Sequence, residues 1–337
     1  MTNIAIIGYG YWGKNLFRNF QSHKNIEIKY VIDKDKQKLE YINKHFPSIN
    51  TEINYKITLE DKSIDALIIA TPSSSHYIIA KEALLAGKHV FIEKPMTTSL
   101  KDALELKKIA INQNKIIQID YTFIYTSAVR KIKELINNKE IGDILFFDST
   151  RINLGIFQSD VNVLWDLAAH DISIMHFLIK DKLLSVQAVG ISHATNNIEN
   201  IAYLTIRFKK NIIAHFNCSW SSPVKIRMLL IGGENKMIVF NDLEPTEKLK
   251  IYQTNLKNNI DKYRNNLLVD YRTGDLFIPK LDNTEALYNI THEFIQCIKQ
   301  NKQPESNADF GIEVIRILEA AEESIKHRGK EVILDDI

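Results

Sequence analysis

Short apolar segments alternate with longer, helix-patterned segments along the first 140 residues. The short segments are rich in β-branched residues and predict strands, whereas the longer ones carry apolar residues at helical spacing. The predicted strands are 3–8, 26–33, 65–71, 89–95 and 115–122, and the predicted helices are 12–23, 35–46, 75–86 and 99–114. Alternation at this length predicts a parallel sheet with helices on both faces.

The pattern changes beyond one more predicted helix at 127–141. Consecutive apolar segments follow, with tight connections at 209–211 and 232–235, and strands joined this way predict an antiparallel sheet. These strands are predicted at 143–153, 184–193, 201–208, 211–219, 225–231, 236–241 and 249–252. Helices are predicted at 163–178, 284–300 and 310–327, and the polar segment 253–275 is predicted to be a long loop.

The composition is consistent with this α/β fold and excludes several functional classes. The 43 basic and 41 acidic residues nearly balance, so no basic field indicates nucleic acid or an anionic membrane as a partner. No apolar run is long enough for a transmembrane helix, and no signal-peptide pattern begins the chain. Cys218 and Cys297 stand far apart and match no metal spacing. We therefore expect a cytoplasmic protein without a disulfide framework or a bound metal.

The loop after the first predicted strand is a G-x-G-x-x-G motif that opens the first helix. Its residues are Gly8, Gly10, Tyr11, Trp12 and Gly13, with Tyr9 between the first two. Such a loop turns tightly, admits a pyrophosphate close to the backbone and aims a helix N-terminus at the phosphates. Asp33 ends the second strand, where a carboxylate binds the adenosine ribose and repels a 2′-phosphate. NAD is therefore favoured over NADP, a preference that the adjacent Lys34 would weaken.

Two further motifs stand at the ends of predicted strands, where ligands bind on open parallel sheets. One is Ala70-Thr71-Pro72-Ser73, a rigid turn with free hydroxyls; the other is Glu93-Lys94-Pro95, whose lysine would stabilise developing negative charge. The Lys94–Pro95 bond is a candidate for the cis form. By itself, His76 fits a surface or capping position. The predicted cofactor-binding set is completed by Thr71, Pro72, Ser73, His76, Glu93 and Lys94.

The segment Trp165-Asp166-Leu167-Ala168-Ala169-His170-Asp171 carries the remaining chemistry. Asp166 and His170 are four residues apart, so a helix presents both on one face. A carboxylate beside an imidazole forms the pair that a general base needs near neutral pH. A surface ion pair and a metal site are the alternatives, although no third ligand with close spacing accompanies these two.

In this order and spacing, the four motifs resemble the Gfo/Idh/MocA oxidoreductase family over nearly the whole chain. The resemblance implies a Rossmann domain over 1–122 and a C-terminal α/β domain over 123–309, built on a large open, mainly antiparallel sheet. It also implies a closing helix within 310–337, packed on the first domain, and a homodimer or homotetramer that associates through the sheet. The catalytic trio that it implies comprises Lys94, Asp166 and His170.

Other segments resemble the branch of this family that acts on nucleotide-linked sugars. They are Arg151–Gly155, Asp160–Val163, Tyr271–Asp275, Pro279 and Glu285–Leu287. The branch implies hydride transfer at a ring carbon, often C3, as in a UDP-N-acetylglucosamine 3-dehydrogenase whose keto product feeds an aminotransferase. Arg151 and Asn153, with Asp166, are the expected substrate contacts; the alternative for Arg151 and Asn153 is a sheet residue with a solvated tip.

The sequence departs from the family pattern at two places, and two functions compete with the nucleotide-sugar dehydrogenase. Asp120-Tyr121 stands where Gly-His is frequent, which leaves the substrate open, and Ala169 replaces a common proline, which we expect to change only local rigidity. One rival is a dehydrogenase of a free polyol such as an inositol. The other is a non-catalytic, NAD-sensing regulator, which would not need Lys94 and His170.

Overall fold

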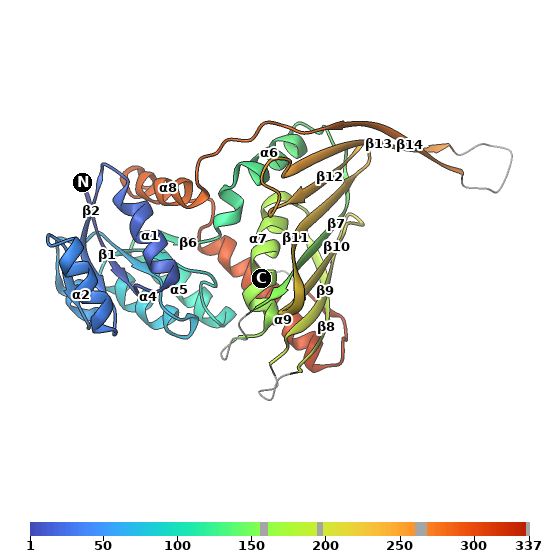
Figure 1. Ribbon diagram of the computed structural model, residues 1–337. Helices are drawn as coiled ribbons and strands as arrows, with labels where there is room; N and C mark the ends of the chain where they lie inside the picture. Colours follow the sequence, from blue (N-terminus) through green and yellow to red (C-terminus); the bar gives the residue numbers. More distant parts are fainter. Residues whose placement is uncertain (156–160, 194–197, 260–267, 335–337) are drawn as a thin grey trace. The chain divides into compact units, whose positions relative to one another are not determined.

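The computed structural model describes residues 1–155, 161–193, 198–259 and 268–334, with the side chains of 254–259 and 268–273 left aside. The chain forms two compact units, and neither is continuous in sequence (Figure 1). Unit 1 comprises Met1–Tyr125 and Thr284–Arg316, and unit 2 comprises Thr126–Asn283 and Ile317–Ile337. Asp160 and the side chains of Tyr271, Arg272 and Thr273, which the branch resemblance includes, lie outside the described part.

Unit 1 is built on a six-stranded parallel sheet in the order β3-β2-β1-β4-β5-β6. Its strands are β1 (Thr2–Ile7), β2 (Ile26–Ile32), β3 (Asn50–Glu52), β4 (Ala66–Ile69), β5 (His89–Ile92) and β6 (Ile117–Ile119). Its helices are α1 (Tyr11–Gln21), α2 (Lys36–His45), α3 (Lys56–Glu60), α4 (His76–Leu85), α5 (Leu100–Asn112) and α8 (Ala286–Gln300), with short 3-10 turns at Ser73–Ser75 and Thr122–Tyr125. All four residues of β4 are buried, because elements cover both faces of the sheet.

Unit 2 is built on a nine-stranded sheet in the order β14-β13-β12-β11-β7-β10-β9-β8-β15. Its strands are β7 (Ile144–Leu154), β8 (Leu183–Ile191), β9 (Ile201–Phe208), β10 (Ile213–Ser219), β11 (Ser221–Gly233), β12 (Lys236–Asn241), β13 (Leu249–Asn259), β14 (Leu268–Phe277) and β15 (Val332–Ile333). Only β7 and β10 pair in parallel, so the sheet is mixed but mainly antiparallel, as predicted.

One face of the unit 2 sheet carries helices, as the alternating burial along its strands shows. In β9, Ala202, Leu204 and Ile206 are fully buried, whereas Tyr203 on the other face is exposed. The helices are α6 (Ser127–Asn137) and α7 (Ala169–Leu178), the latter preceded by a π turn at Leu164–Ala168 (Figure 1). No helix of the described residues is long and apolar enough to cross a membrane.

Two parts of the secondary structure differ from the sequence prediction. The short strand β3 and helix α3 were not expected, and the loop predicted at 253–275 is wrong: β13 and β14 pair there from Ile251↔Phe277 to Asn259↔Leu268. The sequence of this segment shows no apolar alternation. Its two strands lie at the edge of the sheet, where β13 pairs with β12 and β14 pairs with β13. The backbone ladder between β13 and β14 defines this hairpin.

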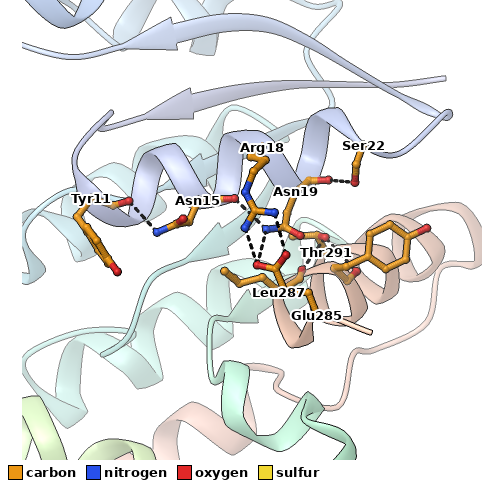
Figure 2. A network of polar contacts seen from close by, with 9 residues as sticks. Tyr11, Asn15, Arg18, Asn19, Ser22, Glu285, Leu287 and Thr291 are labelled. Atoms are coloured by element: carbon orange, nitrogen blue, oxygen red, sulfur yellow. Dashed lines mark hydrogen bonds and ion pairs between the residues drawn. The ribbon is translucent and has the colours of Figure 1, made fainter. Parts of the chain in front are cut away.

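Helix α8 belongs to unit 1, although the sequence placed it in the second domain. Arg18 on α1 makes a bidentate ion pair with Glu285 at the start of α8, at 2.6 and 2.8 Å (Figure 2). Beneath it, Phe294 packs edge to face against Phe20 and Phe91, with ring centroids 6.3 and 5.5 Å apart. These contacts pair residues more than 200 positions apart, which a local pattern does not reveal.

Helix α9 (Ala308–Lys326) begins in unit 1 and ends in unit 2. Gly311 faces Met96 and Ile119 so closely that a Cβ there would lie 3.0 Å from the Met96 sulfur. Further along, Ser324 Oγ donates to the Ala188 carbonyl of β8. Only the first turns of the predicted closing helix therefore pack within the Rossmann unit.

Candidate active site

The glycine motif forms the loop between β1 and α1, and each of its glycines meets a different constraint. Gly8 has φ +93°, and a Cβ there would lie 2.5 Å from the Ala70 carbonyl oxygen. A Cβ on Gly13 would lie 1.9 Å from the Gly8 carbonyl oxygen, whereas one on Gly10 would meet nothing within 4 Å. Protein atoms therefore leave no room for a side chain at Gly8 and Gly13, whereas the space beside Gly10, where α1 begins, is open. Tyr11 and Trp12 are exposed beside this opening.

Asp33 lies where the sequence predicted, directly after β2, and its carboxylate is held on both oxygens. Oδ2 accepts from the Tyr9 backbone N–H at 2.7 Å, and Oδ1 accepts from the Asp35 N–H at 2.9 Å. Lys38 on α2 reaches both oxygens, at 3.1 and 3.3 Å. Burial opposes ionisation of Asp33, but the backbone N–H groups and Lys38 outweigh it and lower the pKa of this carboxyl.

Lys38, rather than Lys34, is thus the lysine that contacts Asp33. No motif marks this lysine, because its partner Asp33 is five positions away, across the turn into α2. If Asp33 binds the ribose as predicted, this cation would reduce the negative charge that a 2′-phosphate meets.

The turn after β4 is tied to the loop after β5 by His76. This side chain is 1% exposed, so the surface position expected for it is wrong. Its Nδ1 lies 2.8 Å from the Pro95 carbonyl oxygen and its Nε2 lies 2.8 Å from that of Thr71. His76 therefore couples the two motifs through backbone groups, and its contact with a cofactor stays a prediction.

Lys94 follows β5 at the same edge of the sheet, and the Lys94–Pro95 bond is cis, as anticipated. Its backbone N–H donates to Glu93 Oε2 at 3.1 Å. Glu93 itself is buried, so the glutamate of this motif faces the protein and the lysine is left partly exposed.

In unit 2, Asp166 lies on the π turn and His170 on the first turn of α7. The turn is widened because the Ala169 N–H donates to the Leu164 carbonyl, five residues back. A proline in place of Ala169 has no N–H to donate, so this residue affects more than the local rigidity we expected. Trp220, 1% exposed, donates its indole N–H to Asp166 Oδ2 at 3.0 Å.

Arg151 on β7 is turned toward α7. Its Nε and Nη2 donate to the two oxygens of Asp171, at 2.9 and 2.6 Å, and Ser149 Oγ donates to Oδ2 at 2.6 Å. Arg151 is 4% exposed, so the solvated-tip alternative is wrong for it. The Arg151–Asp171 pair fixes the residue that follows His170. Asn153 lies half-buried further along β7.

The structure thus gathers the predicted residues in two sets. The glycine loop, Asp33, Thr71 and Lys94 stand at the carboxyl edge of the unit 1 sheet, and Asp166, His170 and Arg151 belong to unit 2. Among the described residues, no three His, Cys, Asp or Glu side chains cluster as a metal site would require.

Two family models match the chain in succession. Residues 2–121 match the oxidoreductase family with an NAD-binding Rossmann fold, and residues 129–239 match the GFO/IDH/MocA C-terminal domain. The chain belongs to the Gfo/Idh/MocA family. The resemblance seen in the motifs is thereby confirmed at the level of the family, and the protein is an NAD-dependent oxidoreductase.

Individual Gfo/Idh/MocA proteins share the fold at low identity. Inositol 2-dehydrogenase/D-chiro-inositol 3-dehydrogenase of Lacticaseibacillus casei is 24% identical over 248 residues, 69% of this chain and 71% of that protein. Levoglucosan dehydrogenase with NADH superposes with a TM-score of 0.84 at 19% identity, over the whole of both chains. UDP-N-acetylglucosamine 3-dehydrogenase GnnA of Acidithiobacillus ferrooxidans gives 0.78 at 20% identity, covering 96% of this chain and 98% of that one.

The residues of this Gfo/Idh/MocA chain fit NAD. The space before Gly10, which a Cβ would enter, lies at the N-terminus of α1, where backbone N–H groups bind phosphate oxygens. The ionised Asp33 carboxylate is placed to accept hydrogen bonds from the ribose hydroxyls. Lys94, at the end of β5, would contact the nicotinamide half of the cofactor.

Proposed function

We propose that this protein transfers a hydride between NAD and a ring carbon of a sugar, with C3 of a nucleotide-linked sugar as the first substrate to test. The observation that carries the proposal is the anchored segment of unit 2: buried Trp220 holds Asp166, and Arg151 holds the residue after His170. With these buried partners, the Asp166 carboxylate and the His170 imidazole provide the rigid acid–base pair that a dehydrogenase needs.

The chain's own residues manage the proton and the charge on the oxygen. In oxidation, the His170 imidazole takes the hydroxyl proton while the carbon loses its hydrogen with both electrons and forms a carbonyl. Lys94 donates a hydrogen bond to that oxygen, and Asp166 orients the substrate and His170. The cofactor, when bound, would accept the hydride as NAD in oxidation and supply it as NADH in reduction. The reverse reaction uses the same groups.

The nucleotide-linked sugar is supported by the segments Arg151–Gly155 and Glu285–Leu287 and by the likeness to GnnA. A free polyol is the second candidate, favoured by the relationship to the inositol dehydrogenase of L. casei. Association of subunits through the unit 2 sheet, as a homodimer or homotetramer, is part of the same proposal.

The test is an absorbance assay at the NADH band against UDP-sugars, dTDP-sugars and inositols. Lys94→Met and His170→Asn should lower turnover by roughly 100-fold or more, because each removes a group that acts in the transition state. NADH affinity, measured by fluorescence titration, should stay close to wild type for His170→Asn.

Lys101→Met, at an exposed position on α5, is the matched control and should leave turnover unchanged. Undiminished turnover in both Lys94→Met and His170→Asn would refute the mechanism. Tight NADH binding without turnover on any substrate of the panel would favour the regulatory alternative instead.

A further inference from the structure

Two buried carboxyl groups meet at the carboxyl edge of the unit 1 sheet. β5 and β6 run side by side with Ile92 opposite Ile119, so Glu93 and Asp120 leave the sheet next to one another. The Asp120 N–H still donates to the Ile92 carbonyl at 2.8 Å, which continues the pairing by one residue. Glu93 is 7% exposed and Asp120 is 2% exposed.

The two carboxyl groups follow the paired ends of β5 and β6, and each acts on the pKa of the other. Two ionised carboxylates contain no donor, so a hydrogen bond between them requires that one of them carries a proton. No N–H or hydroxyl group of the described residues donates to Asp120 Oδ2, whereas Oδ1 accepts from the Thr122 hydroxyl. The neighbouring Glu93 carboxyl is therefore the group that would satisfy Asp120 Oδ2 once one of the two carries a proton.

The electrostatics agree with one shared proton. Burial, and then repulsion by Asp120, raise the pKa of Glu93 well above its ordinary value. Burial raises the pKa of Asp120 to about 6, against the opposing effects of Thr122 and Glu93. Lys94 is the charged neighbour that acts on both groups, and it lowers both pKa values. Near neutral pH, the pair therefore holds one proton and titrates as a unit.

The pair leads directly to Lys94. Glu93 Oε2 accepts from the Lys94 backbone N–H at 3.1 Å, so the contacts run from Thr122 to Asp120, then to Glu93 and to the Lys94 backbone. We propose that Asp120 is a positioning residue for Lys94: it shares one proton with Glu93, and the pair holds the backbone that carries the lysine. The effect on turnover rests on the proposed function; the proton and the backbone contact do not.

The shared proton is tested by infrared spectroscopy of the protein without cofactor, through the carbonyl stretch of a protonated carboxyl group. We expect such a band at neutral pH and its loss in Glu93→Gln. As the pH rises, the band should disappear earlier in Asp120→Asn than in wild type, because the neutral Asn no longer repels the ionised form of Glu93. Glu322→Gln, which alters a partly buried carboxyl of unit 2, should leave the band in place.

The positioning of Lys94 is tested by hydrogen exchange of its backbone N–H, followed by NMR. Exchange should be faster in Asp120→Ala than in wild type, and Asp120→Asn should restore most of the protection because Asn still hydrogen-bonds to Glu93. If a substrate has been found, kcat of Asp120→Ala should fall roughly 100-fold, as for a misplaced catalytic group, with NADH affinity kept. Asp120→Asn should recover much of that loss.

An absent band, or a band with the same pH midpoint in wild type and Asp120→Asn, would overturn the shared proton. Unchanged exchange at Lys94 in Asp120→Ala would overturn the positioning role. If Asp120→Ala does not fold, the pH midpoint of the infrared band in Asp120→Asn still decides whether the proton is shared. A protein with the expected band and exchange but without turnover would contradict the proposed function and leave this pair standing.

Discussion

The glycines in the loop between β1 and α1 differ in the space that their surroundings leave for a side chain. Gly13 has no room for a Cβ because the Gly8 carbonyl oxygen would lie 1.9 Å from it, whereas Gly10 faces open space. Gly13 is thus required by the fold itself, whereas the fold leaves space at Gly10, where we expect the cofactor to bind. The motif assigns these separate roles to the two glycines, and the structure supplies the distances behind them.

We therefore expect opposite results from two alanine substitutions. Gly13→Ala should lose about 1–3 kcal/mol or more of stability, because the β1–α1 loop must move. Gly10→Ala should change stability by less than about 0.5 kcal/mol yet weaken NADH binding, since its methyl group enters the phosphate space. Chemical denaturation and fluorescence titration measure the two effects. Normal NADH affinity in Gly10→Ala would contradict the placement of the cofactor.

At the residue scale, the sequence predicted which positions carry chemistry better than it predicted their partners. Asp33 and Lys94 stand directly after the expected strands, and Asp166 lies within the predicted helical segment, on its π turn. Lys38, Trp220 and Asp171, which hold Asp33, Asp166 and Arg151, were not identified as partners. Motif spacing is local, whereas Trp220 is 54 residues from Asp166 and contacts it only because β10 ends beside the π turn.

At the scale of elements, apolar periodicity predicted those strands and helices that bury a face. It predicted the start of β13 at 249–252 but missed the rest of β13 and all of β14, and it missed β3, which has only three residues. The π turn before α7 was also beyond it, because one displaced hydrogen bond at Ala169 leaves the apolar pattern unchanged.

The attachment of α7 to β7 gives a prediction at this scale. Asp171→Asn removes the negative charge opposite the buried Arg151 guanidinium and replaces one acceptor oxygen by an NH2 group, which typically costs about 3–5 kcal/mol. Glu134→Gln breaks the exposed Lys131–Glu134 pair on α6 and should cost less than about 1 kcal/mol. Urea denaturation of both variants makes the comparison. Equal losses would show that the buried pair does not hold α7 in place.

For the whole molecule, the expected boundary near residue 122 separates α8 from the sheet it covers. Phe294 of α8 meets Phe20 and Phe91, so the Rossmann unit requires residues from both ends of the chain. Sequence periodicity predicted two α/β parts correctly, but it contains no information about which part a later helix joins.

A fragment comparison tests this division. Residues 1–125 alone should form an unstable, NADH-incompetent domain, because the aromatic cluster is left without Phe294. The same fragment fused through a Gly/Ser linker to residues 284–316 should unfold cooperatively and bind NADH. Circular dichroism and fluorescence titration give the two readouts. A stable, NADH-binding 1–125 fragment would contradict the assignment of α8 to unit 1.

The split of unit 1 also has a consequence for synthesis. Domains fold as their residues leave the ribosome, at about 5–20 residues per second, so unit 1 has to wait on the order of ten seconds while all of residues 126–283 are made. During that time, Phe20 and Phe91 have no aromatic partner from α8. We therefore expect nascent chains to bind NAD only after their synthesis has reached α8.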